Sequence, residues 1–329
     1  MVRPLQAAQS GTGPARFARG YTGPTMTSGR SNASPADPDA DTVGIASAAA
    51  TDQLGAGVWV IVPTYNEAEN LRPISAAILD ALPAATLLVV DDGSPDGTGT
   101  IAAELATADP RIRVRHRRAK EGLGRAYLDG FGVAIAGDAQ AIVQMDADWS
   151  HDPAVLPELV RPIQDGTADL VIGSRYAKGG GVVDWGLGRR IISRGGSLFA
   201  RTVLNLGPHD LTGGFKAWRR STLEGIPFAG VHAGGYVFQI EMTFRASRAG
   251  ARIREVPITF RDRRIGQSKM SRRIVIEALV VVVQLRIEEL FRRFRRRYAA
   301  IEAPEAAAAD SGRAVTDTGP DPRPAGEGG

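Results

Sequence analysis

Short apolar runs rich in β-branched residues alternate with helix-like segments along the middle of the chain. The runs are VWVIVP, TLLVVD, RIRVRH, AIVQMD and DLVIGS, at residues 58–63, 86–91, 111–116, 141–146 and 169–174. Such alternation is typical of βαβ units that build a mostly parallel sheet flanked by helices. Ligands of open sheets of this kind bind beyond the carboxyl ends of the strands. We therefore expect the chemistry near the residues that end the runs, such as Pro63, Asp91, Asp146 and Ser174.

The two ends of the chain lack this pattern. Residues 1–57 and 300–329 are rich in Gly, Ala, Pro, Ser, Thr and Asp and show no apolar periodicity, so we expect two disordered extensions. No secretory signal is predicted, because MVRPLQAAQSGTGP has neither a basic start nor a continuous apolar stretch. One catalytic domain is expected at residues 58–270.

Residues 271–299 read as an amphipathic, Arg-rich helix. The apolar stretch from Ile274 to Ile287 contains Glu277, Gln284 and Arg286, and it is shorter than the 18 or more residues of a membrane span. Beyond it, the predicted helix has apolar side chains on one side and a cluster of arginines on its other sides. Such a helix lies in a bilayer surface or packs on its own domain or on a partner, and the pattern leaves both readings open.

Composition narrows the chemistry. The 329 residues contain no cysteine, which excludes disulfides, thiol nucleophiles and cysteine-bound zinc or iron. The formal charge of +4 suits phosphate-bearing ligands or anionic lipid. The basic run at residues 111–118 has no interleaved aromatic residues, so no nucleic-acid partner is expected. Neither a complete dinucleotide fingerprint nor a Walker-type loop is present, and the four histidines lack metal-ligand spacing.

Three acidic or aromatic motifs follow predicted strands. Asp146 and Asp148, two residues apart, present the hard oxygen ligands that suit Mg²⁺ or Mn²⁺. The stretch DDGSPDGT from Asp91 offers carboxylates for a nucleobase or ribose, and PTYNE from Pro63 presents Tyr65 and Glu67. Each motif alone is equally compatible with a helix-capping turn. Together they converge on one edge of the predicted sheet.

These residues resemble the family 2 glycosyltransferases of GT-A type, and among them the dolichol or polyprenol phosphate mannose synthases. The stretches that carry the resemblance are VIVPTYNEAENL from Val60, VVDDGSPDGT from Val89, QMDADWSHDP from Gln144, IGSRY from Ile172, WGLGRRIISRG from Trp185, DLTGGFKAWRR from Asp210, GYVFQIEM from Gly235 and VPITFRDRRIGQSKMS from Val256. They extend over about residues 58 to 290. The later stretches separate the phosphomannose synthases from the wider family.

The resemblance implies a role for individual residues. Those implied to bind the nucleotide sugar are Pro63, Tyr65, Glu67, Val89, Asp91, Asp146, Ala147, Asp148, Arg175, Arg263 and Lys269. The implied metal ligands are Asp146, Asp148 and the position of Ser150, where some members carry Gln. Charge supports the assignment, because a donor diphosphate and an acceptor phosphate need more compensation than one divalent ion gives.

A basic helical segment after Trp185 is the candidate acceptor site. Arg189 and Ser193 lie four residues apart, as do Arg190 and Arg194, so each pair shares a helix face and either can grip a phosphate. The resemblance favours Arg189 and Ser193, together with Arg175.

Asp148, Arg175 and Glu241 are the candidate catalytic residues. Many family 2 transferases keep an acidic base near the position of Glu241. A phosphate acceptor is mainly a dianion at neutral pH and needs no base. Glu241 is therefore expected to position other groups or to pair with a basic side chain, and Asp210 is a comparable candidate.

The resemblance implies transfer of mannose from GDP-mannose to a polyprenyl phosphate with inversion, dependent on Mg²⁺ or Mn²⁺. The protein is expected in the cytoplasm, peripheral on the cytoplasmic face of the membrane, where a membrane-anchored subunit is a further expected partner. Three alternatives stay open: a UDP-glucose-dependent polyprenyl phosphate glycosyltransferase, a sugar nucleotidyltransferase, and a membrane-bound protein without activity.

Overall fold

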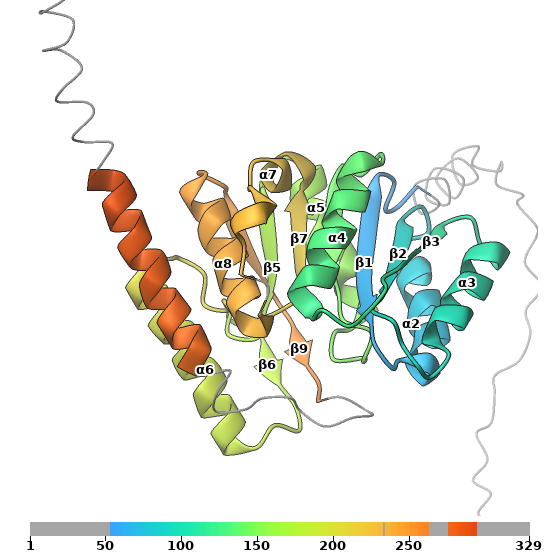
Figure 1. The fold of residues 1–329 in the computed structure, drawn as a ribbon, viewed down its shortest axis with the longest axis horizontal. Coiled ribbons are helices and arrows are strands. Elements are labelled where there is room, and N and C mark those ends of the chain that lie inside the picture. The colour runs from blue at the N-terminus through green and yellow to red at the C-terminus, as the bar shows by residue number, and fades with distance from the viewer. Residues whose placement is uncertain (1–52, 233, 263–275, 295–329) are drawn as a thin grey trace, which may run out of the picture. The chain divides into compact units, whose positions relative to one another are not determined.

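The computed structural model describes residues 53–232, 234–262 and 276–294. Its main sheet has seven strands in the order β3-β2-β1-β4-β7-β5-β8 (Figure 1). The strands are β1 Val58–Thr64, β2 Thr86–Asp91, β3 Ile112–His116, β4 Ala141–Gln144, β5 Leu170–Ser174, β7 Lys216–Arg219 and β8 Ile253–Pro257. All neighbours pair in parallel except β7, which runs antiparallel to both β4 and β5. A second, two-stranded parallel sheet joins β6 Gly181–Val182 to β9 Thr259–Phe260.

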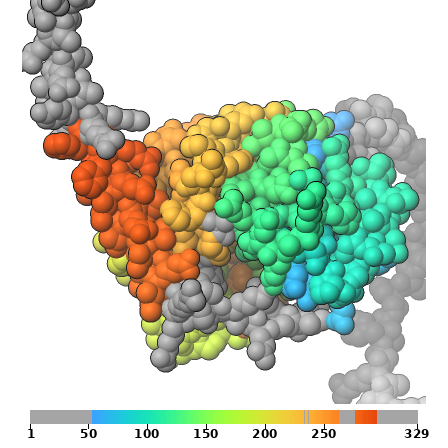
Figure 2. Space-filling view, viewed as in Figure 1, coloured from blue at the N-terminus to red at the C-terminus, as the bar shows by residue number. Residues whose placement is uncertain are grey.

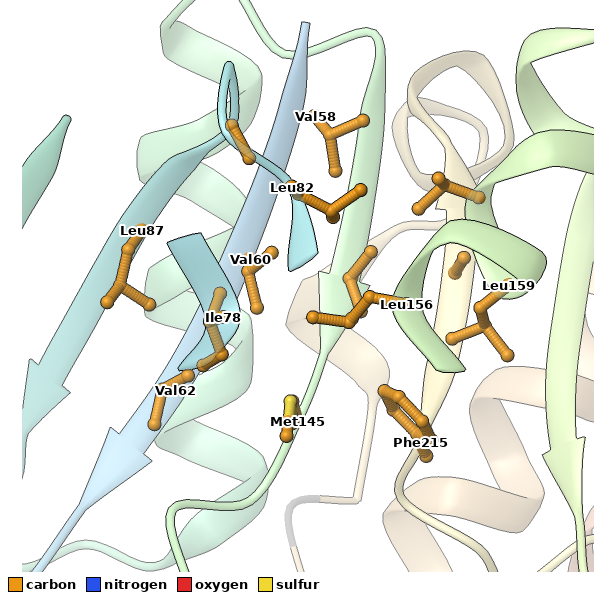
Figure 3. Close-up of a cluster of buried hydrophobic side chains, with 14 of the residues drawn as sticks. Val58, Val60, Val62, Ile78, Leu82, Leu87, Met145, Leu156, Leu159 and Phe215 are labelled. Carbon is orange, nitrogen blue, oxygen red and sulfur yellow. The ribbon is translucent and has the colours of Figure 1, made fainter. Parts of the chain in front are cut away.

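Helices cover both faces of the main sheet, because its central strands carry apolar side chains on both faces. The helices are α2 Ala68–Ala81, α3 Thr98–Ala108, α4 Leu123–Ala136, α5 Leu156–Gln164, α6 Leu187–Leu204, α7 Arg220–Glu224 and α8 Gly235–Arg248, with single 3₁₀ turns at Pro153–Val155 and Phe228–Gly230. On one face, Val58, Val60 and Val62 pack against α2, α3 and α5 (Figure 3). On the other, Trp59 and Ile61 pack against α4, α7 and α8.

The contact between α4 and β1 is unusually close, and it matters for the site. A Cβ added to Gly130 of α4 would lie 2.7 Å from Cγ2 of Ile61, so a larger residue would push the helix off the strand. One turn earlier on α4, the fully buried Tyr127 stacks on Phe238 of α8, with ring centroids 5.9 Å apart. The close packing of α4 against β1 therefore sets the position of the Tyr127 hydroxyl.

A third apolar cluster joins α6 and α8 to a helix at residues 276–294. Ala200 and Leu204 of α6 pack there with Val237 and Ile240 of α8 and with Val281, Val282 and Leu285. In Figure 2 the red surface of helix 276–294 borders the yellow-green surface of α6. None of the helices in the described part of the chain is both long enough and apolar enough to span a membrane.

The predicted α/β architecture with a mostly parallel sheet flanked by helices is confirmed. The five strands predicted from apolar runs are all present, whereas β7 and β8 were not predicted. The helix at residues 276–294 lies inside the predicted amphipathic segment. Nearly all of both predicted disordered extensions lies outside the described residues, so those boundaries stay predictions.

Candidate active site

The residues that follow β1 form the first wall of the site. The backbone leaves the sheet after Thr64 and turns at Asn66, whose φ of 61° is in the left-handed region that Asn tolerates. Nζ of Lys120 lies 3.4 Å from the centroid of the Tyr65 ring. The Glu67 carboxylate accepts a 2.8 Å hydrogen bond from Nδ2 of Asn70, and Pro63 is buried in β1.

The residues at the end of β2 are held in place by hydrogen bonds. The carboxylate of Asp91 accepts bonds from the hydroxyls of Thr64 and Ser94, at 3.3 and 2.5 Å, and from the Ser94 amide. Gly99, in the first turn of α3, lies so close that an added Cβ would be 2.9 Å from Oδ2 of Asp91. Val89 lies two residues before the end of β2 with its side chain in the apolar core, so only its backbone is available to a ligand.

Asp92 belongs to the motif whose carboxylates were expected to meet a nucleobase or ribose, and it has a structural role that the sequence did not indicate. Its carboxylate pairs with Arg117 and accepts the backbone amides of Glu121 and Gly122. These bonds fix the loop between β3 and α4, which carries Lys120 to the ring of Tyr65. The doubled aspartate in the DDG motif was the available signal, since two adjacent carboxylates point to opposite sides of an extended backbone.

Asp146, Ala147 and Asp148 follow β4 and form the floor of the site. The buried Tyr127 hydroxyl donates a 3.0 Å hydrogen bond to Oδ1 of Asp146. Burial, reinforced by Asp146, raises the pKa of Tyr127, so this hydroxyl stays a donor. Asp148 is buried and accepts the Ser150 amide at 3.1 Å, and the turn between them places Trp149 at a φ of 63°.

The neighbourhood of Asp148 fits a hard divalent cation. The Ser150 hydroxyl is buried and makes no hydrogen bond within the described part of the chain, although a buried hydroxyl normally has a partner. Two carboxylates and a neutral oxygen are ligands that Mg²⁺ and Mn²⁺ accept, with further positions left for phosphate oxygens and water.

His151 marks the point at which the acidic and basic parts of the site meet. Its ring is buried and stacks on Phe215 at 4.8 Å between centroids. Burial lowers the pKa of His151, although the charges of Asp146 and Asp148 act in the opposite direction. The ring is therefore neutral at pH 7, and its Nδ1 is 3.4 Å from the Asp146 amide.

A buried ion pair forms the basic side of the site. Arg175 follows β5, and its guanidinium donates bonds of 2.7 Å to both carboxylate oxygens of Asp210 and a third to the Thr212 hydroxyl. Burial opposes the charge of Asp210, but Arg175 outweighs burial and keeps the pKa of Asp210 below its ordinary value. Only 5% of Arg175 is exposed, so its planar fork is held in one orientation.

Lys216 of β7 lies fully buried behind this pair. Its Nζ donates to the Gln239 carbonyl at 2.8 Å and to the Thr243 hydroxyl at 2.9 Å, which ties β7 to α8. Burial lowers the pKa of Lys216 to about 7, with Arg175 acting in the same direction and Asp210 against it. No expectation from the sequence concerned this lysine.

The predicted acceptor residues lie on α6, where both already have partners. Arg189 pairs with Asp262 at 2.7 Å, and its guanidinium lies 4.1 Å from the ring centroid of Trp185. The Ser193 hydroxyl accepts a 2.6 Å hydrogen bond from the Tyr176 hydroxyl. Tyr176 directly follows Arg175, so Ser193 and Arg175 are joined through one residue.

Glu241 and Gln239 both lie on α8, but they differ in their hydrogen bonding. The carboxylate of Glu241 is fully buried and accepts bonds from Nε and Nη2 of Arg245 and from His232, all between 2.6 and 2.9 Å. This pairing with a basic side chain is the arrangement predicted from the sequence. The Gln239 amide is 3% exposed and has no hydrogen-bond partner for either atom among the described residues.

Gln239 is the second residue that the sequence reading missed. A Cβ built on Gly214 would lie 3.4 Å from Nε2 of Gln239 and 3.7 Å from Oδ2 of Asp146. The absence of a side chain at Gly214 thus leaves space between the unpartnered Gln239 amide and the Asp146 carboxylate. The remaining predicted residues, Arg263 and Lys269, lie outside the described residues.

Comparison with known proteins shows the family. The model of glycosyl transferase family 2 matches residues 59–226. The chain belongs to glycosyltransferase family 2. The undecaprenyl-phosphate mannosyltransferase of Micrococcus luteus is 46% identical over 227 residues, which are 69% of this chain and 93% of that protein. The polyprenol monophosphomannose synthase of Mycolicibacterium smegmatis is 47% identical over 226 residues, which are 68% of this chain and 85% of that protein.

Solved structures show the fold of this family 2 glycosyltransferase. Glucosyl-3-phosphoglycerate synthase from Mycobacterium tuberculosis, in complex with Mn²⁺, UDP and glucosyl-3-phosphoglycerate, matches with a TM-score of 0.51 at 22% identity, over 72% of this chain and 81% of that one. The same enzyme with phosphoglyceric acid matches with a TM-score of 0.50 at 19% identity, over the same shares. The predicted GT-A fold is thereby confirmed.

Proposed function

We propose that this glycosyltransferase moves mannose from GDP-mannose to the phosphate of a polyprenyl lipid, with inversion, giving β-linked polyprenyl phosphate mannose. The relatives in Micrococcus and Mycolicibacterium, named for this class of reaction, support the acceptor and the sugar. The observation that carries the proposal is the buried Arg175–Asp210 pair, which lies near enough to the carboxylates of Asp146 and Asp148 for all four charges to act on the ring of His151.

The donor nucleotide is proposed to lie along the ends of β1, β2 and β4. Tyr65, Glu67 and Asp91 then face the base and ribose, while the backbones of Pro63, Val89 and Ala147 line the slot. Asp146, Asp148 and the Ser150 hydroxyl would hold Mg²⁺ or Mn²⁺, which when bound neutralises diphosphate charge and stabilises the leaving group. A structural neighbour of the same fold holds Mn²⁺ with UDP, which supports such an ion. Arg263 and Lys269 are proposed to contact the diphosphate.

The chemical step needs no general base. At neutral pH the acceptor phosphate is mainly a dianion, since its second pKa is about 6. One of its oxygens attacks the anomeric carbon of mannose, forming a new C–O bond, while the bond from that carbon to the diphosphate breaks and its electron pair leaves with GDP. Arg175 lies in a desolvated setting, where a fixed positive charge stabilises the phosphates more than it would in water.

The other polar residues are proposed to position these groups. Arg189 and Ser193 grip the acceptor phosphate together with Arg175. Asp210 holds the Arg175 fork, and Glu241 anchors α8 through Arg245 and His232. The unpartnered amide of Gln239 can donate to and accept from hydroxyl groups, so we assign it to the sugar.

The lipid acceptor places the reaction at a membrane surface. On helix 276–294, Val281, Val282 and Leu285 pack inward. The opposite side exposes a stripe of large apolar residues, which comprises Ile276, Leu279, Val280, Val283, Ile287, Leu290, Phe291 and Phe294. Such a stripe beside basic side chains suits insertion into the interface of a bilayer. We propose peripheral binding at the cytoplasmic face, with a membrane-anchored subunit as a further partner.

A single assay tests the reaction. The full chain is incubated with Mg²⁺ or Mn²⁺, a polyprenyl phosphate, and either labelled GDP-mannose or labelled UDP-glucose, and the lipid is extracted into organic solvent. Label from GDP-mannose in the lipid phase is the expected result. Label from UDP-glucose alone would replace the proposed donor, and release of pyrophosphate from a nucleoside triphosphate would indicate a nucleotidyltransferase instead.

A further inference from the structure

Three arginines line one pocket beside α6. The pocket has a volume of about 250 Å³ and is bounded by Arg175, Tyr176, Arg190, Arg194 and the short segment Gly180–Val182. No carboxylate lies among these lining residues of the described chain. The volume is several times the roughly 30 Å³ that one water molecule occupies in the liquid, so the pocket accommodates a phosphate group with its ester oxygens.

Two of the three arginines have no acidic partner among the described residues. Arg190 donates to the Val182 carbonyl at 3.3 Å, and the Arg194 guanidinium lies 5.4 Å from the ring centroid of Tyr176. Within the described residues, no carboxylate lies within ion-pair distance of either. Their neighbour Arg189, by contrast, is paired with Asp262. Two unneutralised planar guanidinium groups on one helix face form a site that suits a phosphate, which they can bind through paired N–H groups.

Apolar side chains flank the same arginines. Leu187, Ile191 and Leu198 of α6 are 75%, 63% and 63% exposed. Their spacing of four and seven residues puts them on one face of the helix, next to Arg190 and Arg194. An anion bound in the pocket therefore lies at the edge of an exposed apolar strip. The ligand that matches both features has a phosphate and a hydrocarbon tail.

We propose that Arg190 and Arg194, on the side of the pocket away from Arg175, bind the head-group phosphate of an anionic membrane lipid. This second phosphate site adjoins the acceptor grip, because Arg175 lines the pocket and also belongs to the grip with Arg189 and Ser193. The inference extends the proposed function, because an enzyme that must meet a rare lipid acceptor gains from a fixed orientation on an anionic bilayer. The binding itself requires no catalytic turnover.

Vesicle flotation of the full chain tests the proposal. Vesicles of phosphatidylcholine alone are compared with vesicles that also contain phosphatidylglycerol. The double variant Arg190→Gln/Arg194→Gln is expected to lose about 25-fold in affinity for the anionic vesicles, since one basic residue near such a surface contributes about fivefold. Binding to the neutral vesicles is expected to stay unchanged.

Two control variants separate a built pocket from general charge attraction. Arg161→Gln/Arg254→Gln removes two exposed arginines of α5 and β8 and lowers the net charge equally, and it should leave anionic binding within twofold. Arg190→Lys/Arg194→Lys keeps the charge but removes the planar forks, and it should bind several-fold more weakly than the unaltered chain. Equal losses in both glutamine variants, or full binding by the lysine variant, would overturn the proposal.

Two further arms identify the source of the phosphate. Thermal unfolding is compared in inorganic phosphate and in chloride at matched ionic strength. Stabilisation by phosphate that depends on Arg190 and Arg194, combined with unchanged vesicle binding, would show a site for free phosphate and overturn the lipid assignment. In detergent micelles without phospholipid, the Arg190→Gln/Arg194→Gln variant should keep its KM for polyprenyl phosphate. A rise equal to that of Arg189→Gln would instead make the pocket part of the acceptor grip.

If the proposed reaction itself is wrong, no variant transfers label to lipid, while the vesicle and unfolding results stand unchanged. Failure of the lipid site and failure of the proposed function are therefore distinguishable.

Discussion

The two halves of the sheet edge are built in opposite ways. The half formed by β1, β2 and β4 presents carboxylates that are bonded by near neighbours in sequence, such as Asp91 with Ser94 and Asp148 with Ser150. The half formed by β5 and β7 presents cations that are held by distant residues, such as Arg175 with Asp210. The first half combines such turns with bonds between more distant residues, such as Tyr127 with Asp146, whereas the buried cations of the second half are held by residues far apart in the sequence.

This difference has an energetic consequence. The acidic half keeps its shape through short turns, so removing one carboxylate should change chemistry more than stability. The basic half depends on buried charges that compensate each other, so removing one should change stability as well as chemistry. Measuring both kcat and the free energy of unfolding should therefore distinguish variants of the acidic half from variants of the basic half.

The largest expected effect is that of Asp148→Asn on the rate. Loss of one of two carboxylates in the proposed metal site should lower kcat by about a thousandfold, which is about 4 kcal/mol of transition-state stabilisation. Unfolding in denaturant should stay close to that of the unaltered chain. Asp152→Asn, which changes a cap outside the site, is the matched control. Near-normal turnover by Asp148→Asn would overturn the assignment of this residue.

Asp210→Asn should reveal the opposite behaviour. It leaves the Arg175 guanidinium buried without a counter-ion, which we expect to lower the free energy of unfolding by about 3 kcal/mol. Glu224→Gln, which breaks an exposed pair with Arg220, should lower it by less than about 1 kcal/mol. Urea unfolding followed by circular dichroism measures both. Equal small losses would mean that the Arg175–Asp210 pair does not organise this half of the site.

Lys216 adds a pH dependence to the same half. Its pKa of about 7 in the folded protein lies below the ordinary value of 10.5. Between these values the unfolded chain keeps the proton that the folded chain has lost, so stability rises with pH, and below pH 7 the burial penalty is fully present. Unfolding at several pH values should show this rise in the unaltered chain and its absence in Lys216→Met. Parallel pH profiles of the two proteins would contradict the prediction.

The smallest expected effect is that of Gln239, which lies between the acidic and basic halves of the site. Gln239→Leu replaces an unpartnered buried amide by an apolar group of similar size, so stability should be unchanged or slightly raised. If the amide contacts the sugar, kcat/KM for the donor should fall about tenfold, which corresponds to about 1.4 kcal/mol. A loss of stability without a loss of rate would assign Gln239 to packing alone.

The sequence predicted the features that depend on residues close together in the chain. The strands ending near Pro63, Asp91 and Asp146 appear as apolar runs followed directly by their polar residues, so motif and position coincide. The antiparallel β7 broke the βαβ alternation and was not predicted, because KAWR is too short for a period to show.

The contacts of the basic half were beyond the reach of a single sequence. Arg175 and Asp210 are 35 positions apart, and Arg189 and Asp262 are 73 apart. Nothing in either stretch indicates the other, since only the packing of β5, α6 and β9 brings them together. For the same reason helix spacing alone did not separate the pair Arg190 and Arg194 from Arg189 and Ser193, which the resemblance favoured. The pocket became distinct only when Arg189 was seen with its partner.

The most direct test of the central claim is transfer of labelled mannose from GDP-mannose into polyprenyl phosphate, measured before and after exhaustive chelation. The account predicts synthesis of labelled lipid with Mg²⁺ or Mn²⁺, loss of that synthesis on chelation, and recovery when the ion is restored. Undiminished synthesis after chelation, with folding intact, would contradict it.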